Sequence, residues 1–176
     1  FIGSQLVRKL VDRGYEVSGY DLKSAGDITD PTATFKAIKK CDYVFHLAAV
    51  SNLNFAQADP NEAMRINIYG TYVVAKCCSE LSVPLGFAST CCVYGNTLEH
   101  PSTEKSVCVP TEIYAVTKLV GESIIRGLSQ KYGLNYNILR FGTTYGPGMR
   151  KELAVYIFIK HALEGKPLPI LLGFSL

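Results

Sequence analysis

The sequence predicts an α/β fold built on a doubly wound parallel sheet. Two observations support this class. Strand-like and helix-like segments alternate along the 176 residues, and the strand-like segments are nearly continuous apolar runs, as in YVFHLAAV at 43–50. Such runs are typical of parallel strands covered on both faces. Strands that alternate with helices indicate right-handed βαβ units.

Each element follows from a local pattern. EVSGYD at 16–21 alternates apolar residues and is the first expected strand. PLGFAST at 84–90 is an apolar run that ends in two hydroxyl residues. The other expected strands are 43–50, 135–142 and an extended piece that starts in PLPILLG at 167–173. The expected helices are 32–41, about 59–81, about 111–131 and 152–165. The loop from 95 to 110 is long and polar, which is typical of a site-bearing loop at a strand end.

Composition narrows the function classes. The chain is 48% hydrophobic and 19% charged, which is enough for one globular core. Its formal net charge is +3 and its basic residues are scattered, so we expect no nucleic-acid partner. No run of about 18 apolar residues occurs, so we expect no membrane-spanning segment.

Six cysteines are present, without a Cys-x-x-Cys spacing, and the three histidines stand apart. We therefore expect no metal site. The adjacent pairs Cys77/Cys78 and Cys91/Cys92 suit small buried hydrophobic residues better than a disulfide framework. Reduced thiols favour a cytoplasmic location.

Three residues indicate a chemistry. Tyr114 and Lys118 lie four apart in a helix-like stretch, which places a phenol and an ammonium on one helix face. A phenol has a pKa of about 10, and a nearby cation lowers it towards working pH. Thr90 ends the run at 84–90 and offers a hydroxyl to a substrate oxygen. Together these three residues suit the transfer of a proton to or from a carbinol while a hydride leaves or enters the same carbon.

The spacing alone is weak, because Tyr72/Lys76 and Tyr156/Lys160 repeat it. Apolar neighbours around Tyr156 indicate packing, and Tyr72 sits in a small-residue helix typical of a core element. Only Tyr114 follows a strand that ends in hydroxyl residues. We therefore select Tyr114.

At this point the sequence resembles a known family, the extended short-chain dehydrogenases, and within it the NAD-dependent sugar epimerase/dehydratase group. The matching stretches appear in the family's order and span nearly the whole chain. They are FIGSQLV, GYEVSGYD, GDITD, VFHLAAV, INIYGTYVVAKCC, FASTCCVYG, YAVTK, LRFGTTYGPGMR and ALEGKPLPI. The resemblance implies a Rossmann-like NAD-binding domain at 1–150, incomplete at its N-terminus, and the start of a substrate-binding region at 151–176.

In that family a first strand and a Gly-x-x-Gly-x-x-Gly turn precede the first helix. Here FIG opens the chain, with Gly3 at the place of the last glycine. We expect the chain as written to lack that strand and to fold poorly or aggregate, because its absence would expose sheet edges. A cooperative thermal unfolding transition of the 176-residue chain would contradict this.

The adenosine half of NAD is expected at three residues. Asp21 ends the first expected strand, where a carboxylate accepts the ribose hydroxyls and repels a 2′-phosphate, which favours NAD over NADP; the alternative is a loop or cap residue. Asp27 and Ile28 resemble the family segment that contacts adenine, with a solvated turn as the alternative.

Further cofactor contacts are expected at Leu47, Ala48 and Ala49 at the end of the strand expected at 43–50, the two alanines being small enough for close approach. His46 is interpreted as a packing residue. Asn67 is implied to order the site and the strand behind it, with an ordinary surface position as the alternative. Ser89 is included as a hydroxyl donor next to Thr90.

The resemblance implies that Tyr114 is the acid/base, that Lys118 lowers its pKa and bonds the nicotinamide ribose, and that Thr90 holds the substrate hydroxyl. The implied reaction is NAD-dependent epimerisation of a nucleotide-sugar through a transient ketone. Cys91 and Cys92 occupy the places where sugar 4,6-dehydratases carry acidic residues, which argues against dehydration. Thr143 replaces an asparagine that contacts the diphosphate in many relatives, and we assign it to substrate.

Arg140 and Arg150 are candidate phosphate contacts, with surface salt bridges as the default. Two alternatives to the epimerase stay open: an NAD(P)-dependent reductase or dehydrogenase of another secondary alcohol, and a non-catalytic NAD-binding protein. The family also pairs subunits through two long helices, so a homodimer through 59–81 and 111–131 is expected.

Overall fold

The computed structural model describes residues 1–24 and 26–169, which fall into two compact units. The smaller unit combines Phe1–Val17 with the chain from Thr143 onward, and the larger covers Ser18–Gly142. Helices α1 (Ile2–Val11) and α7 (Ala154–Leu163) belong to the smaller unit. The domain boundary expected at residue 150 stays a prediction.

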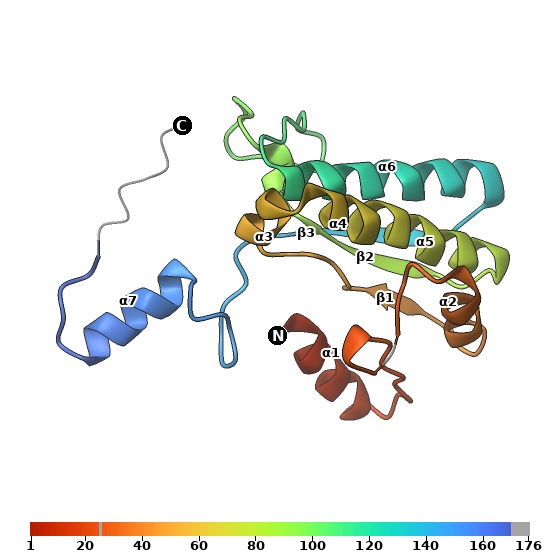
Figure 1. The fold of residues 1–176 in the computed structure, drawn as a ribbon, viewed down its shortest axis with the longest axis horizontal. Helices are drawn as coiled ribbons and strands as arrows, with labels where there is room; N and C mark the ends of the chain where they lie inside the picture. The colour runs from red at the N-terminus through yellow and green to blue at the C-terminus, as the bar shows by residue number, and fades with distance from the viewer. Residues whose placement is uncertain (25, 170–176) are drawn as a thin grey trace. The chain divides into compact units, whose positions relative to one another are not determined.

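The larger unit is built on three parallel strands (Figure 1): β1 (Val44–His46), β2 (Leu85–Thr90) and β3 (Tyr136–Phe141), in the order β1-β2-β3. In register, Val44 is opposite Leu85, and Leu85 is opposite Tyr136. All three strands therefore end at one edge of the sheet. The parallel sheet expected from the sequence is confirmed.

The strand expected at 16–21 is wrong, because these residues join no strand. A strand requires a hydrogen-bonded neighbour, and the three described strands pair only with one another. The strand expected at 43–50 is shortened to Val44–His46. At the end of the expected strand, the N–H and the carbonyl of Val50 bond to the side chain of Asn67 and not to a neighbouring strand. Residues 170–173 of the last expected piece lie outside the described residues.

Helices α2 (Pro31–Ile38), α5 (Thr71–Glu80) and α6 (Ile113–Tyr132) lie side by side along one face of the sheet (Figure 1). The carboxylate of Asp30 starts α2 by accepting from two backbone N–H groups. Gly133, with φ of 73°, ends α6 in the left-handed conformation. The helices expected at 32–41 and 111–131 are confirmed.

The long helix expected at 59–81 is confirmed as continuous helix over residues 60–80, with a change of helix type in its middle. α4 (Pro60–Met64) leads into a π-helical segment, Arg65–Gly70, and then α5. A short helix that the sequence did not predict, α3 (Leu53–Ala58), precedes them and is capped by Asn52. π-helical segments widen the turn and occur frequently at functional sites. This one carries Asn67.

The core lies between the sheet and the helices. Leu85, Phe87 and Ile125 are all fully buried there. Gly121 lets α6 approach β2, since a Cβ at this position would lie 2.9 Å from Cζ of Phe87. Close helix-to-sheet contact therefore depends on a residue without a side chain.

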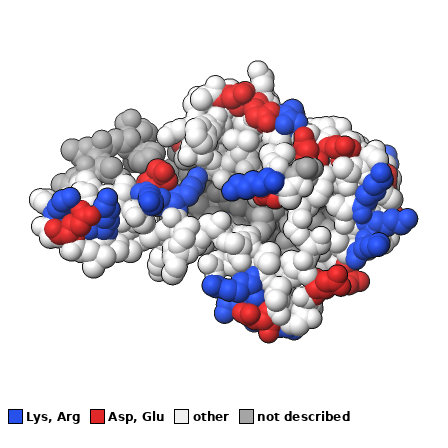
Figure 2. Space-filling view, turned by 60° about the horizontal axis from the view of Figure 1, so that its bottom comes forward, with Lys and Arg blue, Asp and Glu red and all other residues white. Residues whose placement is uncertain are grey.

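The surface is mixed in charge. On the face that Figure 2 shows, basic and acidic side chains are interspersed. Within 1–24 and 26–169, each helix is either too short or too polar to cross a bilayer.

We predict that Gly121→Ala lowers the free energy of unfolding by about 1–3 kcal/mol, because the added methyl group overpacks the contact with Phe87. Gly127→Ala is the matched control on the same helix. Nothing lies within 4 Å of a Cβ there, so alanine is expected to stabilise the protein by about 0.5–1 kcal/mol. Urea unfolding of the intact protein measures both. Equal effects at the two positions would contradict the packing argument.

Candidate active site

Thr90 stands at the carboxyl end of β2, where its side chain is buried. Its Oγ1 accepts a hydrogen bond of 3.2 Å from the backbone N–H of Cys92 and so caps the 3₁₀ turn Cys91–Tyr94. This bond fixes the rotamer of the Thr90 side chain, and in it Oγ1 acts as the acceptor. The oxygen is held at the sheet edge where ligands bind in open α/β folds.

Tyr114 and Lys118 occupy the first two turns of α6, one above the other. Tyr114 is half-buried, and its carbonyl accepts a 2.7 Å hydrogen bond from Oγ1 of Thr117. Lys118 is 2% exposed, with its ammonium 4.8 Å from the ring centre of Phe87 on β2. The structure thus brings Lys118 over the strand that ends in Thr90.

Burial lowers the pKa of Lys118 to about 8. An ammonium removed from water gains from an anion beside it. The residue one turn away on the same face is Tyr114. The arrangement therefore suits a phenolate stabilised by a buried ammonium.

Asn67 connects the loop after β1 to α6 by hydrogen bonds. Its Oδ1 accepts from the N–H of Val50 at 2.8 Å, and its Nδ2 donates to the carbonyl of Val50 at 3.0 Å. The same Nδ2 donates to Oγ1 of Thr117 at 3.0 Å. Asn67 is fully buried, so the alternative of an ordinary surface residue is wrong. The loop after β1 is thereby anchored one helical turn from Tyr114.

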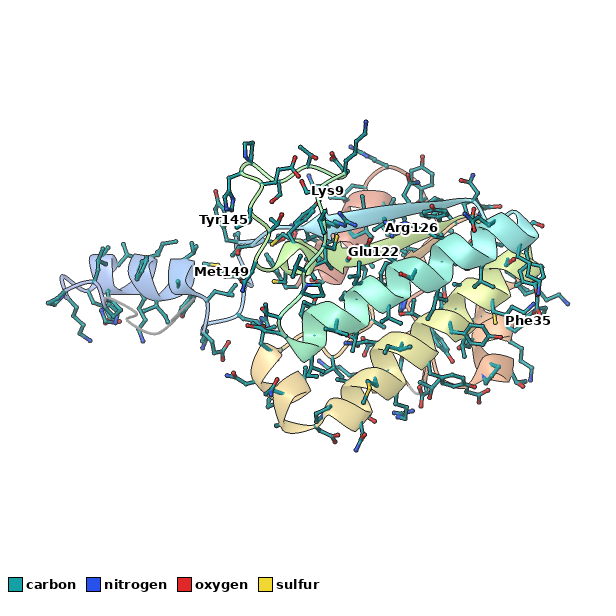
Figure 3. The ribbon with its side chains drawn as sticks, turned by 90° about the horizontal axis from the view of Figure 1, so that it is seen from above. Lys9, Phe35, Glu122, Arg126, Tyr145 and Met149 are labelled. Atoms are coloured by element: carbon teal, nitrogen blue, oxygen red, sulfur yellow. The ribbon has the colours of Figure 1, made fainter. Side chains whose placement is uncertain are left out.

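A buried carboxylate lies one turn beyond Lys118. Glu122 is fully buried and accepts a 2.6 Å hydrogen bond from Oγ of Ser89. Arg140 binds it with two hydrogen bonds, at 2.9 and 2.8 Å. Arg126, labelled with Glu122 on α6 in Figure 3, adds a third arginine contact at 2.8 Å. The carboxylate therefore joins α6 to β2 and β3.

Burial by itself raises the pKa of Glu122, but hydrogen bonds from Arg140 and Ser89, together with the charges of both arginines, outweigh it. The pKa lies below its ordinary value and the group is ionised. Glu122 was not among the residues predicted from the sequence. Glu122 lies on the same helix face as Tyr114 and Lys118. This spacing could have identified it, because a carboxylate that faces the core requires a partner. Arg140 forms the salt bridge that was the default expectation for it, but with a buried carboxylate and not at the surface, since its side chain is only 12% exposed.

His46 packs in the interior, as expected. Its Nε2 lies 2.9 Å from Oγ1 of Thr71 and its ring is 5.5 Å from that of Phe87. Burial, and then the charge of Lys118, lower its pKa to about 3. It is therefore neutral at physiological pH.

The residues expected at the adenosine are spread along 21–28. The exposed carboxylate of Asp21 accepts the N–H of Lys23 at 3.0 Å. Asp27 accepts from the N–H and Oγ1 of Thr29, both at 2.8 Å, and these bonds hold the pKa of its carboxyl below the ordinary value. Ile28 is 7% exposed and part of the hydrophobic core. Their roles stay predictions.

The other expected ligand contacts fall in two places. Leu47, Ala48 and Ala49 are half-buried and follow directly on β1 at the carboxyl edge. Gly3 and Thr143 belong to the smaller unit, Gly3 within α1. Contacts of all five with a cofactor or substrate stay predictions.

The two adjacent cysteine pairs differ. Cys77 and Cys78 are buried, as expected, whereas Cys91 and Cys92 are exposed. The expectation was wrong for the second pair because it lies in the 3₁₀ turn after β2 and not in a helix that packs on the sheet.

A family model matches residues 1–173, that of the NAD dependent epimerase/dehydratase family. UDP-glucuronate 4-epimerase 4 of Arabidopsis thaliana is 34% identical over 150 residues, covering 82% of this chain and 34% of that protein. The structure of UDP-glucose 4-epimerase from Thermotoga maritima with UDP-glucose superposes with a TM-score of 0.86 and 28% identity, over 94% of this chain and 61% of that one.

UDP-glucuronic acid 4-epimerase of Bacillus cereus, solved with NAD, is 32% identical with a TM-score of 0.71, over 82% of this chain and 46% of that one. These likenesses make the fold Rossmann-like. The chain spans less than two thirds of each of the three proteins.

We predict that Glu122→Ala lowers the free energy of unfolding by about 3–5 kcal/mol, because it removes the counter-ion of Arg140, whose side chain is only 12% exposed. Glu62→Ala is the matched control. That carboxylate also binds an arginine, Arg65, but both side chains are 45% exposed, so little change is expected. Urea unfolding of both variants measures the difference, and similar losses would contradict the assigned burial.

We predict that acid destabilises the protein through His46. Between pH 6.5 and 5 the unfolded chain protonates this histidine and the folded chain does not, because its folded pKa is about 3. Stability therefore falls as the pH drops, by up to about 1.4 kcal/mol per pH unit. His46→Gln removes the proton site, and its unfolding free energy should depend less on pH over this range. The same slope in both proteins would exclude His46 as the cause.

Proposed function

The chain belongs to the NAD dependent epimerase/dehydratase family, and from that premise we propose that it carries the NAD site and the acid/base apparatus of a nucleotide-sugar 4-epimerase. The observation that carries the proposal is the buried ammonium of Lys118, one helical turn from Tyr114 and over the strand that ends in Thr90. The named relatives that act on UDP-sugars support the substrate class.

The residues present fit NAD. An exposed carboxylate at Asp21 suits the ribose hydroxyls, and the small residues Ala48 and Ala49 follow a strand end where a dinucleotide approaches the backbone. Lys118 offers an ammonium over β2, the strand that ends in Thr90. NAD, when bound, supplies the hydride acceptor and donor for the sugar carbon.

In the proposed cycle Tyr114 takes the proton of the sugar hydroxyl while the hydride leaves the same carbon, and a keto sugar forms. Thr90 donates a hydrogen bond to the substrate oxygen and keeps it in reach of the phenol. Lys118 stabilises the phenolate. After the ketone turns its other face, Tyr114 returns a proton as the hydride returns. Positioned acid/base groups of this kind contribute roughly 10²–10⁴ in rate.

Dehydration is disfavoured by the turn after Thr90. Its exposed residues are Cys91 and Cys92, and a thiol does not replace a carboxylic acid in the elimination of water.

One assay distinguishes the proposed epimerase from a dehydrogenase that oxidises another alcohol. Incubation of the intact protein with UDP-glucose or UDP-glucuronic acid should yield the C4 epimer with no lasting absorbance of reduced cofactor. Steady accumulation of reduced cofactor without an epimer would overturn the proposal.

We also propose an oligomeric state and a cellular location. A homodimer through α5 and α6 is supported by the exposed aromatic side chains Tyr72 and Tyr132 on these helices. A cytoplasmic location is supported by six free cysteines.

We predict that Tyr114→Phe reduces turnover by at least about 10²-fold while NAD binding is kept, since only the proton-transfer group is lost. Tyr72→Phe and Tyr156→Phe are the matched controls, because both tyrosines share the four-residue spacing to a lysine. Both should retain full turnover. The measurement combines epimer formation with calorimetric titration of NAD. Activity in Tyr114→Phe, or its loss in a control, would reassign the base.

A further inference from the structure

Two adjacent thiols lie directly beside the hydroxyl at the end of β2. Cys91 and Cys92 follow Thr90 without an intervening residue, and both are exposed. The proposed reaction uses neither of them. They are the only described cysteines that are exposed, because Cys77 and Cys78 are buried and Cys41 and Cys108 are half-buried.

The backbone holds this pair in a fixed place. The N–H of Cys92 binds Oγ1 of Thr90 at 3.2 Å, and the carbonyl of Cys92 accepts from the N–H of Gly95 at 3.1 Å. Val93, between these contacts, is fully buried and anchors the turn. The two thiols are therefore presented on a rigid turn whose cap is Thr90.

The two side chains also interact with each other. Partial burial, and then the neighbouring thiol of Cys92, raise the pKa of Cys91. A protonated thiol is a poor nucleophile towards reagents that take one thiolate. A ligand that bonds to two sulfur atoms suits the pair better, because the adjacent positions of Cys91 and Cys92 make the second bond an intramolecular step.

From this geometry we infer that Cys91 and Cys92 form a chelating site for trivalent arsenicals. In the reaction with an organoarsenic oxide, two S–As bonds form and the bonds from arsenic to its oxygen break. The two thiol protons leave with that oxygen as water. Arsenic stays trivalent, so no oxidant or reductant takes part. The organic group on arsenic then lies beside Thr90.

The chain supplies its own control. Cys77 and Cys78 are also adjacent, but they sit in α5, fully or nearly fully buried, with Sγ of Cys77 against the carbonyl of Pro31. Burial raises the pKa of Cys78 to about 12. The same sequence pattern therefore occurs once on the surface and once in the core, and only the surface pair offers two sulfur atoms to a ligand.

The test uses phenylarsine oxide and the intact protein, with adducts counted by native mass spectrometry. We expect one phenylarsenic group per chain, removed by a dithiol such as 2,3-dimercaptopropanol and retained against excess monothiol. Cys91→Ser and Cys92→Ser should each lose the monothiol-resistant adduct completely, whereas Cys77→Ala and Cys78→Ala should keep it. No adduct on the wild-type chain, or an adduct retained by Cys91→Ser, would overturn the inference.

A second arm tests the consequence for the site, and this arm rests on the proposed function. The adduct should abolish epimerisation, and saturating UDP-sugar should slow its formation. An adduct that forms with full activity would overturn the claim that the bound group covers Thr90. Because the mass measurement needs no activity, a failure of the epimerase proposal and a failure of the dithiol site give different results.

Discussion

The buried carboxylate of Glu122 is the constraint on which the site depends. It accepts hydrogen bonds from Ser89 on β2, from Arg140 on β3 and from Arg126 on its own helix. Ser89 and Arg140 are also direct neighbours in the sheet. One group therefore sets the distance and register between α6 and the carboxyl ends of two strands. Thr90 and Lys118 each lie within four residues of a member of this cluster, so their mutual placement follows from it.

Burial, together with the partners that replace water, determines the pKa values of the charged groups in the site. Glu122 stays ionised because two guanidinium groups and a hydroxyl replace the water that it lost. Among residues 1–24 and 26–169, no salt bridge joins Lys118 to a carboxylate, and its pKa falls to about 8 because burial penalises its charged form. A buried cation that lacks a carboxylate is held ready to stabilise an anion that forms next to it. In the proposed reaction Tyr114, one helical turn away, supplies that anion.

Asn67 makes a second connection between elements, and its inward position accounts for the π-helical backbone around it. The π-helical turn at Arg65–Gly70 faces this side chain inward, where it binds both peptide groups of Val50 and the hydroxyl of Thr117. The loop after β1 is thereby ordered next to α6 without a strand partner. Irregular backbone in the larger unit thus occurs where polar side chains replace the hydrogen bonds of regular structure.

The sequence alone determined the parallel α/β class, the two long strands β2 and β3, and the helix that places Tyr114 above Lys118, because apolar periodicity and a four-residue spacing are local properties. It also identified Thr90 at a strand end. Only the tertiary structure decided that Glu122 binds Arg140, 18 residues away, that Asn67 binds Val50, 17 residues away, and that 16–21 forms no strand. It also decided which cysteine pair is exposed. Each of these depends on which segments meet in space, and partners that are distant along the chain leave no periodic signal in it.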